Sequence, residues 1–215
     1  MKDIINIDKT ISRELLRDKD NLWEVLPEIN NYIMKVVDKS GYTEIDSNVW
    51  VGENVIIDKL STIIGPCIIG SNTEVRPGAY IRGNAIIGKN CIIGNSTEIK
   101  NSIICDNCQL SHYNYVGDSV LGYKSHMGAG SITSNVKSDK KLVVVKAGEE
   151  KIETGMKKFG AMLGDEVEVG CGSVLNPGTV VGNHSNIYPL SSVRGFVPAN
   201  SIYKKQGEVV TKEER

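Results

Sequence analysis

A short polar stretch, His112-Tyr113-Asn114-Tyr115-Val116-Gly117-Asp118, interrupts a body of sequence that is otherwise aliphatic and rich in glycine. A neutral imidazole such as that of His112 can accept a proton near neutral pH, which suits a general base. Two cationic side chains, Arg76 and Lys100, stand upstream in the same aliphatic body. A guanidinium binds phosphate through paired hydrogen bonds, and an ammonium binds it as a point charge. Residues of these types are able to transfer a proton and to bind a phosphate.

The elements that would position these residues repeat with a period of six. Aliphatic side chains occupy every sixth position, slip by one residue twice, and resume after the slip. These positions are Val51, Ile57, Ile63, Ile69, Val75, Ile81, Ile87, Ile93, Ile99, then Ile104, Leu110, Val116, then Leu121, Met127, and finally Leu163, Val169, Leu175, Val181, Ile187, Val193. A six-residue period is typical of a β-helix. We therefore predict an all-β chain built on a parallel β-helix, with these side chains inside.

The composition agrees with a narrow interior. A small or branched residue stands two positions before most of the aliphatic positions, as at Cys67, Ala79 and Cys91. Asn or Gly recurs at the turns, where left-handed backbone angles cost little. Aromatic residues make up only 6% of the chain, which is expected if no aromatic column fits inside.

Counting three hexads per coil places the polar residues relative to one another. Arg76 and His112 then share one face, two coils or about 10 Å apart at the usual strand spacing. Lys100, Tyr115 and Asn135 fall on or beside the next face, at successive single-coil steps. All five are expected to gather about one edge of the β-helix.

The chain divides into three parts. Residues 1–45 are predicted to be helical, with helices over 27–38 and 11–17, the former with Ile29, Ile33, Val36 and Val37 on one face. Residues 46–200 form the β-helix, with a charged insertion at 136–158 that contains a hairpin over 142–154. Residues 201–215 are expected to be a charged tail, mobile from residue 204.

Composition also excludes several classes of protein. Lys and Arg number 25 against 26 for Asp and Glu, giving a net charge of −1, so a nucleic-acid partner is not expected. No apolar run approaches the 18 residues or so of a membrane span. The five cysteines are an odd number, and the first residues do not resemble a secretion signal. Reduced thiols and a cytoplasmic location follow.

Other motifs point less clearly to chemistry. Gly83–Asn90 nearly matches a phosphate loop but ends in Asn rather than Ser or Thr and follows the six-residue repeat. Cys105-x-x-Cys108 has no second cysteine pair to complete a metal site. The three histidines, at 112, 126 and 184, do not have the spacing of the zinc carbonic anhydrases that share this repeat. We therefore predict no metal.

An ordered set of motifs in residues 49–200 resembles a known family. The motifs are Val75-Arg-Pro-Gly78, Thr97-Glu-Ile-Lys-Asn101, His112-x-x-Tyr-x-Gly-Asp118, Gly128-Ala-Gly-Ser-Ile-Thr-x-Asn135 and Lys158-Phe-Gly-Ala-x-x-Gly-Asp165. They resemble hexapeptide-repeat acetyltransferases, in particular the glucosamine-1-phosphate N-acetyltransferase domain of bifunctional enzymes of UDP-N-acetylglucosamine synthesis and archaeal-type sugar-phosphate acetyltransferases. The resemblance implies a left-handed β-helix.

The resemblance also implies roles for individual residues. His112 matches the catalytic base. The residues that match those holding the sugar phosphate are Arg76, Lys100, Tyr115, Asn135 and Lys141, and His126 stands where the family commonly has an Asn. The residues that match contacts to coenzyme A are Ala129, Cys171 and Pro189, with Lys204 or Lys205 reaching its phosphates. A homotrimer with active sites between subunits is implied as well.

The sequence therefore predicts an N-acetyltransferase that uses acetyl-CoA as co-substrate and an amino-sugar 1-phosphate, first of all glucosamine 1-phosphate, as acceptor. Two alternatives remain. One is a protein related to sugar-phosphate nucleotidyltransferases, although the chain lacks their α/β domain and glycine-rich nucleotide loop. The other is a non-catalytic β-helix scaffold that docks partners through its helices, against which the His-x-x-Tyr motif argues.

Overall fold

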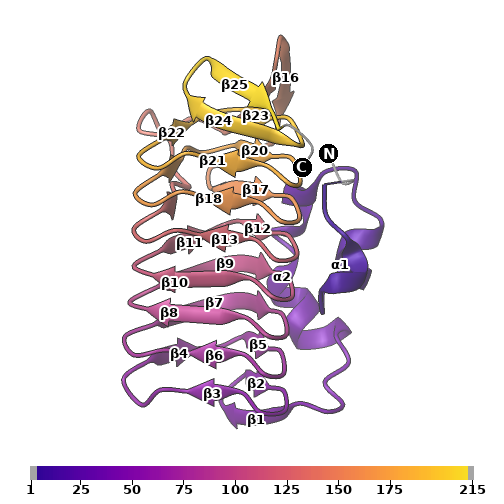
Figure 1. Cartoon of the computed structure of the whole chain (residues 1–215). Coiled ribbons are helices and arrows are strands. Elements are labelled where there is room, and N and C mark those ends of the chain that lie inside the picture. The colour runs from indigo at the N-terminus through magenta and orange to yellow at the C-terminus, as the bar shows by residue number, and fades with distance from the viewer. Residues whose placement is uncertain (1–3, 213–215) are drawn as a thin grey trace.

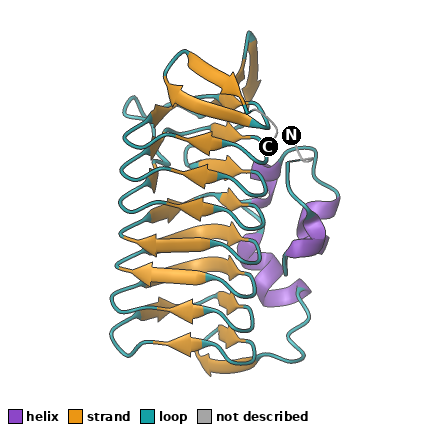
Figure 2. Cartoon of the chain, viewed as in Figure 1, coloured by secondary structure: helices purple, strands orange, loops and turns teal. Residues whose placement is uncertain are grey.

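A parallel β-helix forms most of the computed structural model, which describes residues 4–212 (Figure 1). Each coil contains three short strands joined by corners, so that the strands stack into three faces along the axis (Figure 2). Many corners hold an Asn or Gly with positive φ, such as Asn72, Gly78 and Asn90. These residues adopt left-handed angles at low cost, which explains why they recur at the turns.

The three faces are named here in the order in which a coil visits them. The first face contains β4 (Thr62–Ile64), the first halves of β7 (Tyr80–Ile87) and β9 (Glu98–Ile104), β11 (Tyr115–Gly117), β14 (Ile132–Thr133), β19 (Val174–Leu175) and β22 (Ser192–Val193). The second contains β2 (Val49–Val51), β5 (Cys67–Ile69), the second halves of β7 and β9, β12 (Val120–Leu121), β17 (Ala161–Leu163), β20 (Thr179–Val181) and β23 (Phe196–Val197), with β1 (Thr43–Asp46) antiparallel to β2. The third contains β3 (Ile56–Ile57), β6 (Glu74–Val75), β8 (Ile92–Asn95), β10 (Gln109–His112), β13 (His126–Met127), β18 (Glu168–Val169), β21 (Asn186–Ile187) and β24 (Ser201–Lys205).

The interior confirms the prediction from the six-residue period. Every predicted aliphatic position belongs to one central cluster, with only Val51, Ile57 and Ile63 partly exposed at the N-terminal end. Small residues such as Cys67, Ala85 and Cys91 lie buried beside them. Trp23 and Phe159 pack outside this interior and contact each other with ring centroids 5.5 Å apart.

The second face is buried on both sides. Its inward aliphatic residues are each preceded by an outward apolar one, and the fully buried outward residues are Ile68, Ile86, Ile103, Val120, Met162 and Val180. The N-terminal helices cover the middle of this face (Figure 1), where Trp23, Ile29 and Ile33 are buried against it. Burial of this apolar area stabilises the fold. The helical segment therefore covers an apolar face that would otherwise be exposed to water.

The helical segment differs in detail from its prediction. It contains α1 (Arg13–Arg17), α2 (Ile29–Asn31), a π-helical turn over Tyr32–Val36 and 3₁₀ turns at Ile7–Lys9 and Leu22–Val25. Ile29 and Ile33 are buried as expected, but Val36 is 58% exposed. The hydrogen bond from Val37 N to Tyr32 O spans five residues. This wider turn rotates Val36 out of the apolar face and brings Val37 into it.

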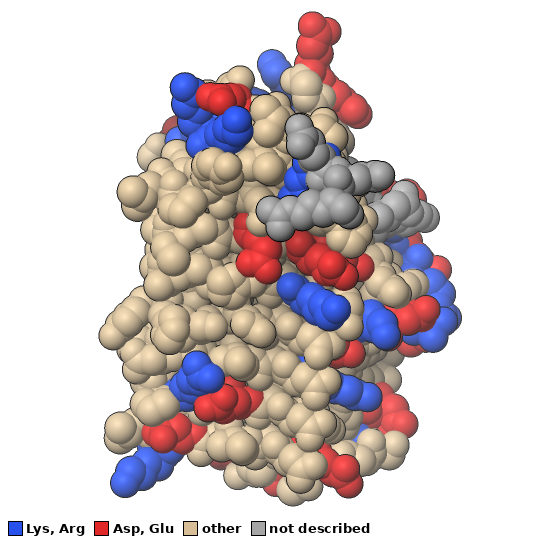
Figure 3. Space-filling view, viewed as in Figure 1, with Lys and Arg blue, Asp and Glu red and all other residues tan. Residues whose placement is uncertain are grey.

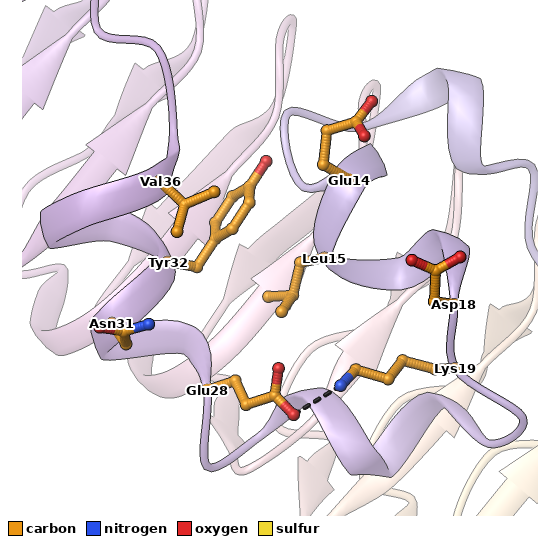
Figure 4. Close-up of a pocket in the computed structure, with 8 residues that line it drawn as sticks. All are labelled: Glu14, Leu15, Asp18, Lys19, Glu28, Asn31, Tyr32 and Val36. Carbon is orange, nitrogen blue, oxygen red and sulfur yellow. Dashed lines mark hydrogen bonds and ion pairs between the residues drawn. The ribbon is translucent and has the colours of Figure 1, made fainter.

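A hollow on the outside of the helical segment lies between α1 and α2 (Figure 4). Leu15, Tyr32 and Val36 form its apolar part. Glu14 and Glu28 supply carboxylates at its rim, and Lys19 donates to Glu28. The hollow belongs to the covering layer and contains none of the predicted site residues.

The insertion leaves and rejoins the β-helix at one corner. Phe159 N donates to Asn135 O at 3.0 Å and Gly160 N to Asp118 O at 2.8 Å, which brings its two ends together. The predicted hairpin is present as β15 (Val144–Ala147) and β16 (Glu150–Glu153), with Gly148 in the turn.

The prediction of a mobile tail from residue 204 is wrong for the described part. Residues 201–205 form β24, which continues the third face by pairing with β21. β25 (Glu208–Thr211) folds back onto β24 as an antiparallel strand. Tyr203 is buried in the interior cluster, so this hairpin caps the end of the β-helix. Residues 213–215 lie outside the described part.

No helix in residues 4–212 is both long and apolar enough to cross a membrane.

Candidate functional site

His112 ends β10 and stands where the third face meets the first, here called the histidine edge. Its carbonyl accepts from Gly130 N at 3.0 Å, and its own N–H donates to Asn114 Oδ1 at 3.3 Å. The buried amide of Asn114 donates in turn to Gly128 O at 2.9 Å, which fixes the corner. The side chain of His112 is exposed, and its imidazole has no hydrogen bond or ion pair with any residue in 4–212. The backbone is thus held while the imidazole stays available to a ligand.

Three of the residues predicted to contact coenzyme A follow His112 along the histidine edge. Ala129, Cys171 and Pro189 occupy the equivalent position in successive coils, as the strand register shows. Backbone hydrogen bonds mark each step, from Gly130 N to His112 O at 3.0 Å, Gly172 N to Ala129 O at 2.8 Å and Leu190 N to Cys171 O at 2.9 Å. The surface beside this edge, on the left in Figure 3, carries few charged side chains between β8 and β21. It is suited to an uncharged, extended part of a ligand.

Asp118 is the centre of a second group, at the edge where the first face meets the second, here called the aspartate edge. Its side chain is 5% exposed. Asn101 Nδ2 donates to its Oδ1 at 2.8 Å, Lys100 Nζ lies 3.4 Å from its Oδ2, and Asn135 Nδ2 donates to the same oxygen. A carboxylate with three donors is well compensated for its burial. Asp118 therefore fixes the side chains of Lys100 and Asn135, both predicted to bind substrate.

Tyr115 spans the first face between the two edges. Its hydroxyl accepts from Asn135 Nδ2 at 3.1 Å. A Cβ on Gly117 would lie 2.5 Å from this hydroxyl, so the tyrosine ring lies over a residue that must lack a side chain. Burial raises the pKa of Tyr115, and the charges of Asp118 and Glu98 raise it further. The phenol is therefore neutral at physiological pH and able to donate a hydrogen bond.

The two arginines near these residues are both paired with carboxylates. Arg76, on the third face two coils before His112, contacts Glu74 through Nε and Nη2, each at 3.1 Å. Arg82, on the first face, contacts Glu98 at 2.6 Å, and this hydrogen bond raises the pKa of Arg82. A phosphate at Arg76 would have to displace Glu74.

The other predicted residues differ in where they lie. His126 begins β13 at the opposite side of the third face from His112, and its Nδ1 lies 2.8 Å from Glu168 Oε2. Lys141 is exposed in the insertion, with its backbone N–H bonded to Asp139. Lys204 and Lys205 end β24 and pair with Glu208 at 3.6 and 3.2 Å. Because Ile187 pairs with Tyr203, Lys205 continues the histidine edge one coil after Pro189.

Sequence reasoning quoted Asp118, Asn101 and Glu98 within motifs but assigned them no role, and it passed over Arg82. A signal for two of these was present. The six-residue phase loses one residue between Ile99 and Ile104 and again between Val116 and Leu121, and Asn101 (φ 45°) and Asp118 (φ 48°) form the two shortened corners. The slips are thus the places where the chain turns polar side chains toward one point.

The cysteines and histidines do not suggest a metal. No cluster of three or more potential ligands exists within the described residues. Cys91 and Cys108 line the interior as predicted, with Cys91 Sγ 3.2 Å from Cys105 O. Burial raises the pKa of the Cys67 thiol to about 12, so this thiol is not a nucleophile.

Comparisons with known proteins identify a family that this chain matches. Residues 63–188 match the family described as the GMPPB C-terminal domain. The bifunctional protein GlmU of Methanococcus aeolicus is 36% identical over 211 residues, covering 90% of this chain and 48% of that protein. The bifunctional sugar-1-phosphate nucleotidylyltransferase/acetyltransferase of Sulfurisphaera tokodaii is 31% identical over 204 residues, covering 80% of this chain and 51% of that protein. The chain therefore spans about half the length of these relatives.

Among solved structures, a hexapeptide transferase family protein from Anaplasma phagocytophilum aligns with a TM-score of 0.49 and 15% identity, covering 77% of this chain and 80% of that one.

Proposed function

The chain belongs to the family of GMPPB C-terminal domains, and on that premise we propose that it is an acetyl-CoA-dependent N-acetyltransferase. The proposed acceptor is an amino-sugar 1-phosphate, with glucosamine 1-phosphate as first choice, and the product would feed the synthesis of UDP-N-acetylglucosamine. The names of the relatives from Methanococcus and Sulfurisphaera support this proposal. The observation that carries it is the unpaired imidazole of His112, across the first face from the Asp118 group and at the head of the Ala129–Cys171–Pro189 column.

In the proposed reaction, the amine nitrogen of the acceptor attacks the thioester carbonyl of acetyl-CoA. The imidazole of His112 takes the proton that the amine loses, the C–S bond breaks, and the sulfur of coenzyme A leaves with a proton. The products are the N-acetylated sugar phosphate and free coenzyme A. A positioned general base contributes roughly 10²–10⁴ in rate, and the free imidazole supports this role for His112.

The carbonyl oxygen becomes negatively charged during the attack and needs a donor. Within Gly128–Ser131, the N–H groups of Gly128, Gly130 and Ser131 donate to backbone carbonyls. The N–H of Ala129 has no acceptor among residues 4–212. Because Ala129 follows His112 by one coil, its N–H is the proposed oxyanion donor.

The acceptor is proposed to lie across the first face. Lys100, Tyr115 and Asn135 would contact it, since Asp118 holds their side chains in a fixed arrangement. Arg76 would reach its phosphate once Glu74 is displaced. His126 and Lys141 are proposed to contact the acceptor only through an arrangement of subunits, because neither lies near Asp118 within one chain.

A homotrimer with active sites between subunits is part of the proposal, and light scattering should then give three times the 23.5 kDa of one chain. A cytoplasmic location is proposed as well and agrees with the five unpaired cysteines.

The experiment that tests the function is a thiol-release assay with acetyl-CoA and a panel of amino-sugar phosphates. Glucosamine 1-phosphate should release coenzyme A, and glucosamine should be a much poorer acceptor. A parallel incubation with UTP and a sugar phosphate should release no pyrophosphate. Pyrophosphate release without acetyl transfer would replace the proposal with the nucleotidyltransferase alternative.

A further inference from the structure

A cavity of about 400 Å³ lies beside the first face where the insertion meets the last coils. This volume is in the range of small-molecule sites, roughly 300–1,000 Å³. Ser134 and Asn176 line it from the first face, and Lys137 and Lys146 line it from the insertion. Arg194, which follows β22, completes its wall. None of these residues belongs to the site proposed above.

The charges in this cavity are unbalanced. Lys137, Lys146 and Arg194 contribute three cations, and Asp139 is the one acidic residue among the lining residues. Lys137 is paired with Asp139 at 3.3 Å. Lys146 and Arg194 make no ion pair with any other residue in 4–212. Two cations thus line the same cavity without a counter-ion, which favours an anionic ligand.

Close packing fixes the backbone segments that carry Lys146 and Arg194, whose side chains are exposed. Val143 and Val145, on either side of β15's first residue, are fully buried. Gly195 has a φ of +76°, and a Cβ at this position would lie 2.8 Å from Lys146 O. The backbone of Lys146 therefore lies directly against the residue after Arg194. Such support preorganises a binding site.

We propose that this cavity binds a phosphate group through Lys146 and Arg194, in addition to any phosphate bound at Arg76 and Lys100. A guanidinium and an ammonium that line one cavity match the three oxygens of a phosphate monoester, and the hydroxyl of Ser134 adds a neutral donor. Two ligands of the proposed reaction carry such a group: the sugar 1-phosphate and the 3′-phosphate of coenzyme A. In naming these ligands, the inference rests on the proposed function.

Binding measurements on the full chain test this site without requiring catalysis. Isothermal titration would compare glucosamine 1-phosphate with glucosamine, and coenzyme A with 3′-dephospho-coenzyme A. The variants are Lys146→Gln, Arg194→Gln and the double variant. Lys151→Gln is the matched control, because Lys151 is the cross-strand partner of Lys146 on the same hairpin and lies outside the cavity. Melting temperatures would establish that all four variants fold.

The double variant should bind one of the two phosphorylated ligands about tenfold more weakly than the wild type does. Lys151→Gln should bind it normally. If the loss is confined to glucosamine 1-phosphate, the cavity holds the acceptor, and if coenzyme A comes to bind no better than its dephospho form, the cavity holds the coenzyme. If the double variant binds both ligands as the wild type does, the proposal that this cavity binds a phosphate is wrong.

The two proposals fail separately. A chain that binds phosphorylated ligands through Lys146 and Arg194 but acetylates nothing would keep the site and remove the proposed function. A chain that acetylates, with phosphate binding unaffected in the double variant, would keep the function and remove the site.

Discussion

The two edges of the first face differ in how their polar side chains are partnered. At the histidine edge, the backbone of His112 is hydrogen-bonded and its imidazole has no partner within residues 4–212. At the aspartate edge, Asp118 is almost fully buried and receives hydrogen bonds or an ion pair from Asn101, Lys100 and Asn135. The histidine edge leaves the imidazole of His112 accessible to a ligand, and the aspartate edge holds Lys100 and Asn135 in place before any ligand binds.

This difference indicates a division of roles. A general base must be able to exchange its proton, so a permanent partner would compete with the substrate for its ring nitrogen. Groups that hold a substrate gain from being fixed beforehand, because less conformational entropy is lost on binding. Catalysis is therefore expected to depend on the histidine edge, and both acceptor binding and local stability on the aspartate edge.

The largest expected effect is that of His112→Ala on turnover. The variant should lower kcat by about 10²–10⁴, because the general base is lost. The melting temperature and the affinity for acetyl-CoA should change little, since the imidazole makes no hydrogen bond or ion pair within residues 4–212. His184→Ala is a control, because His184 is an exposed histidine at another corner, 3.6 Å from Glu166. Equal turnover of His112→Ala and the control would remove the role of His112.

Asp118→Ala should have the opposite profile, with its main effect on stability. Removing the buried carboxylate leaves Lys100, Asn101 and Asn135 without their shared acceptor. The free energy of unfolding should fall by about 2–3 kcal/mol, as measured by urea denaturation. Asp118→Asn, which keeps the shape and one acceptor oxygen, should lose less. A variant as stable as the wild type would show that the cluster does not hold the aspartate edge together.

Arg76 gives a smaller effect, confined to the phosphorylated acceptor. Arg76→Ala should weaken the binding of glucosamine 1-phosphate by about 1.5 kcal/mol. This is the lower end of the range for hydrogen bonds to charged groups, because the guanidinium is already paired with Glu74. Glu74→Gln removes the carboxylate that pairs with the guanidinium and should strengthen the binding of the same ligand. Binding of unphosphorylated glucosamine should not respond to either change. Identical responses of the two sugars would remove Arg76 from the phosphate site.

The smallest effect concerns the helical segment at alkaline pH. Tyr32 donates its hydroxyl to Ile11 O at 3.0 Å, and burial, with Glu14 and Tyr42 nearby, raises its pKa above 10. A group with a raised folded-state pKa adds stability below its unfolded pKa, and this stability is lost as the pH rises through the folded value. Unfolding between pH 8 and about 11 should therefore show a fall in stability that is shallower in Tyr32→Phe. If the free energy of unfolding falls equally steeply in the wild type and in Tyr32→Phe, titratable groups other than Tyr32 cause the fall.

The fold was predictable because its repeat is local. Each hexad places one aliphatic residue inside, and slips such as that between Ile99 and Ile104 are absorbed at a single corner. The helical cover was harder to foresee. Paired apolar residues such as Ile86-Ile87 and Ile103-Ile104 recur on the second face and show that both of its sides are buried, but Ile56-Ile57 has the same pattern with Ile56 exposed. Ile56 lies on the third face, which the helical segment does not cover.

The candidate site was predictable in part for the same reason. Coil counting places His112 and Arg76 on one face and Lys100, Tyr115 and Asn135 about the next, and the structure has this arrangement. The expectation that all five residues gather about one edge is wrong, because Lys100 and Asn135 contact Asp118 at the aspartate edge while His112 lies at the histidine edge, with the first face between them. The hydrogen-bond and ion-pair partners of these side chains could not be predicted from the spacing of the residues in the sequence. The pairing of Arg76 with Glu74, and the role of Asp118, depend on side-chain directions at corners with positive φ. The tail was misjudged because charge was taken for mobility, whereas Tyr203 anchors β24 in the interior.

The most direct test of the division between the two edges is a pair of kinetic constants measured by thiol release. His112→Ala and Asp118→Asn would be compared with the wild type over a range of glucosamine 1-phosphate concentrations at saturating acetyl-CoA. The account predicts a fall in kcat with little change in KM for His112→Ala, and a rise in KM with a smaller change in kcat for Asp118→Asn. A rise in KM alone for His112→Ala, with kcat lost only in Asp118→Asn, would contradict it.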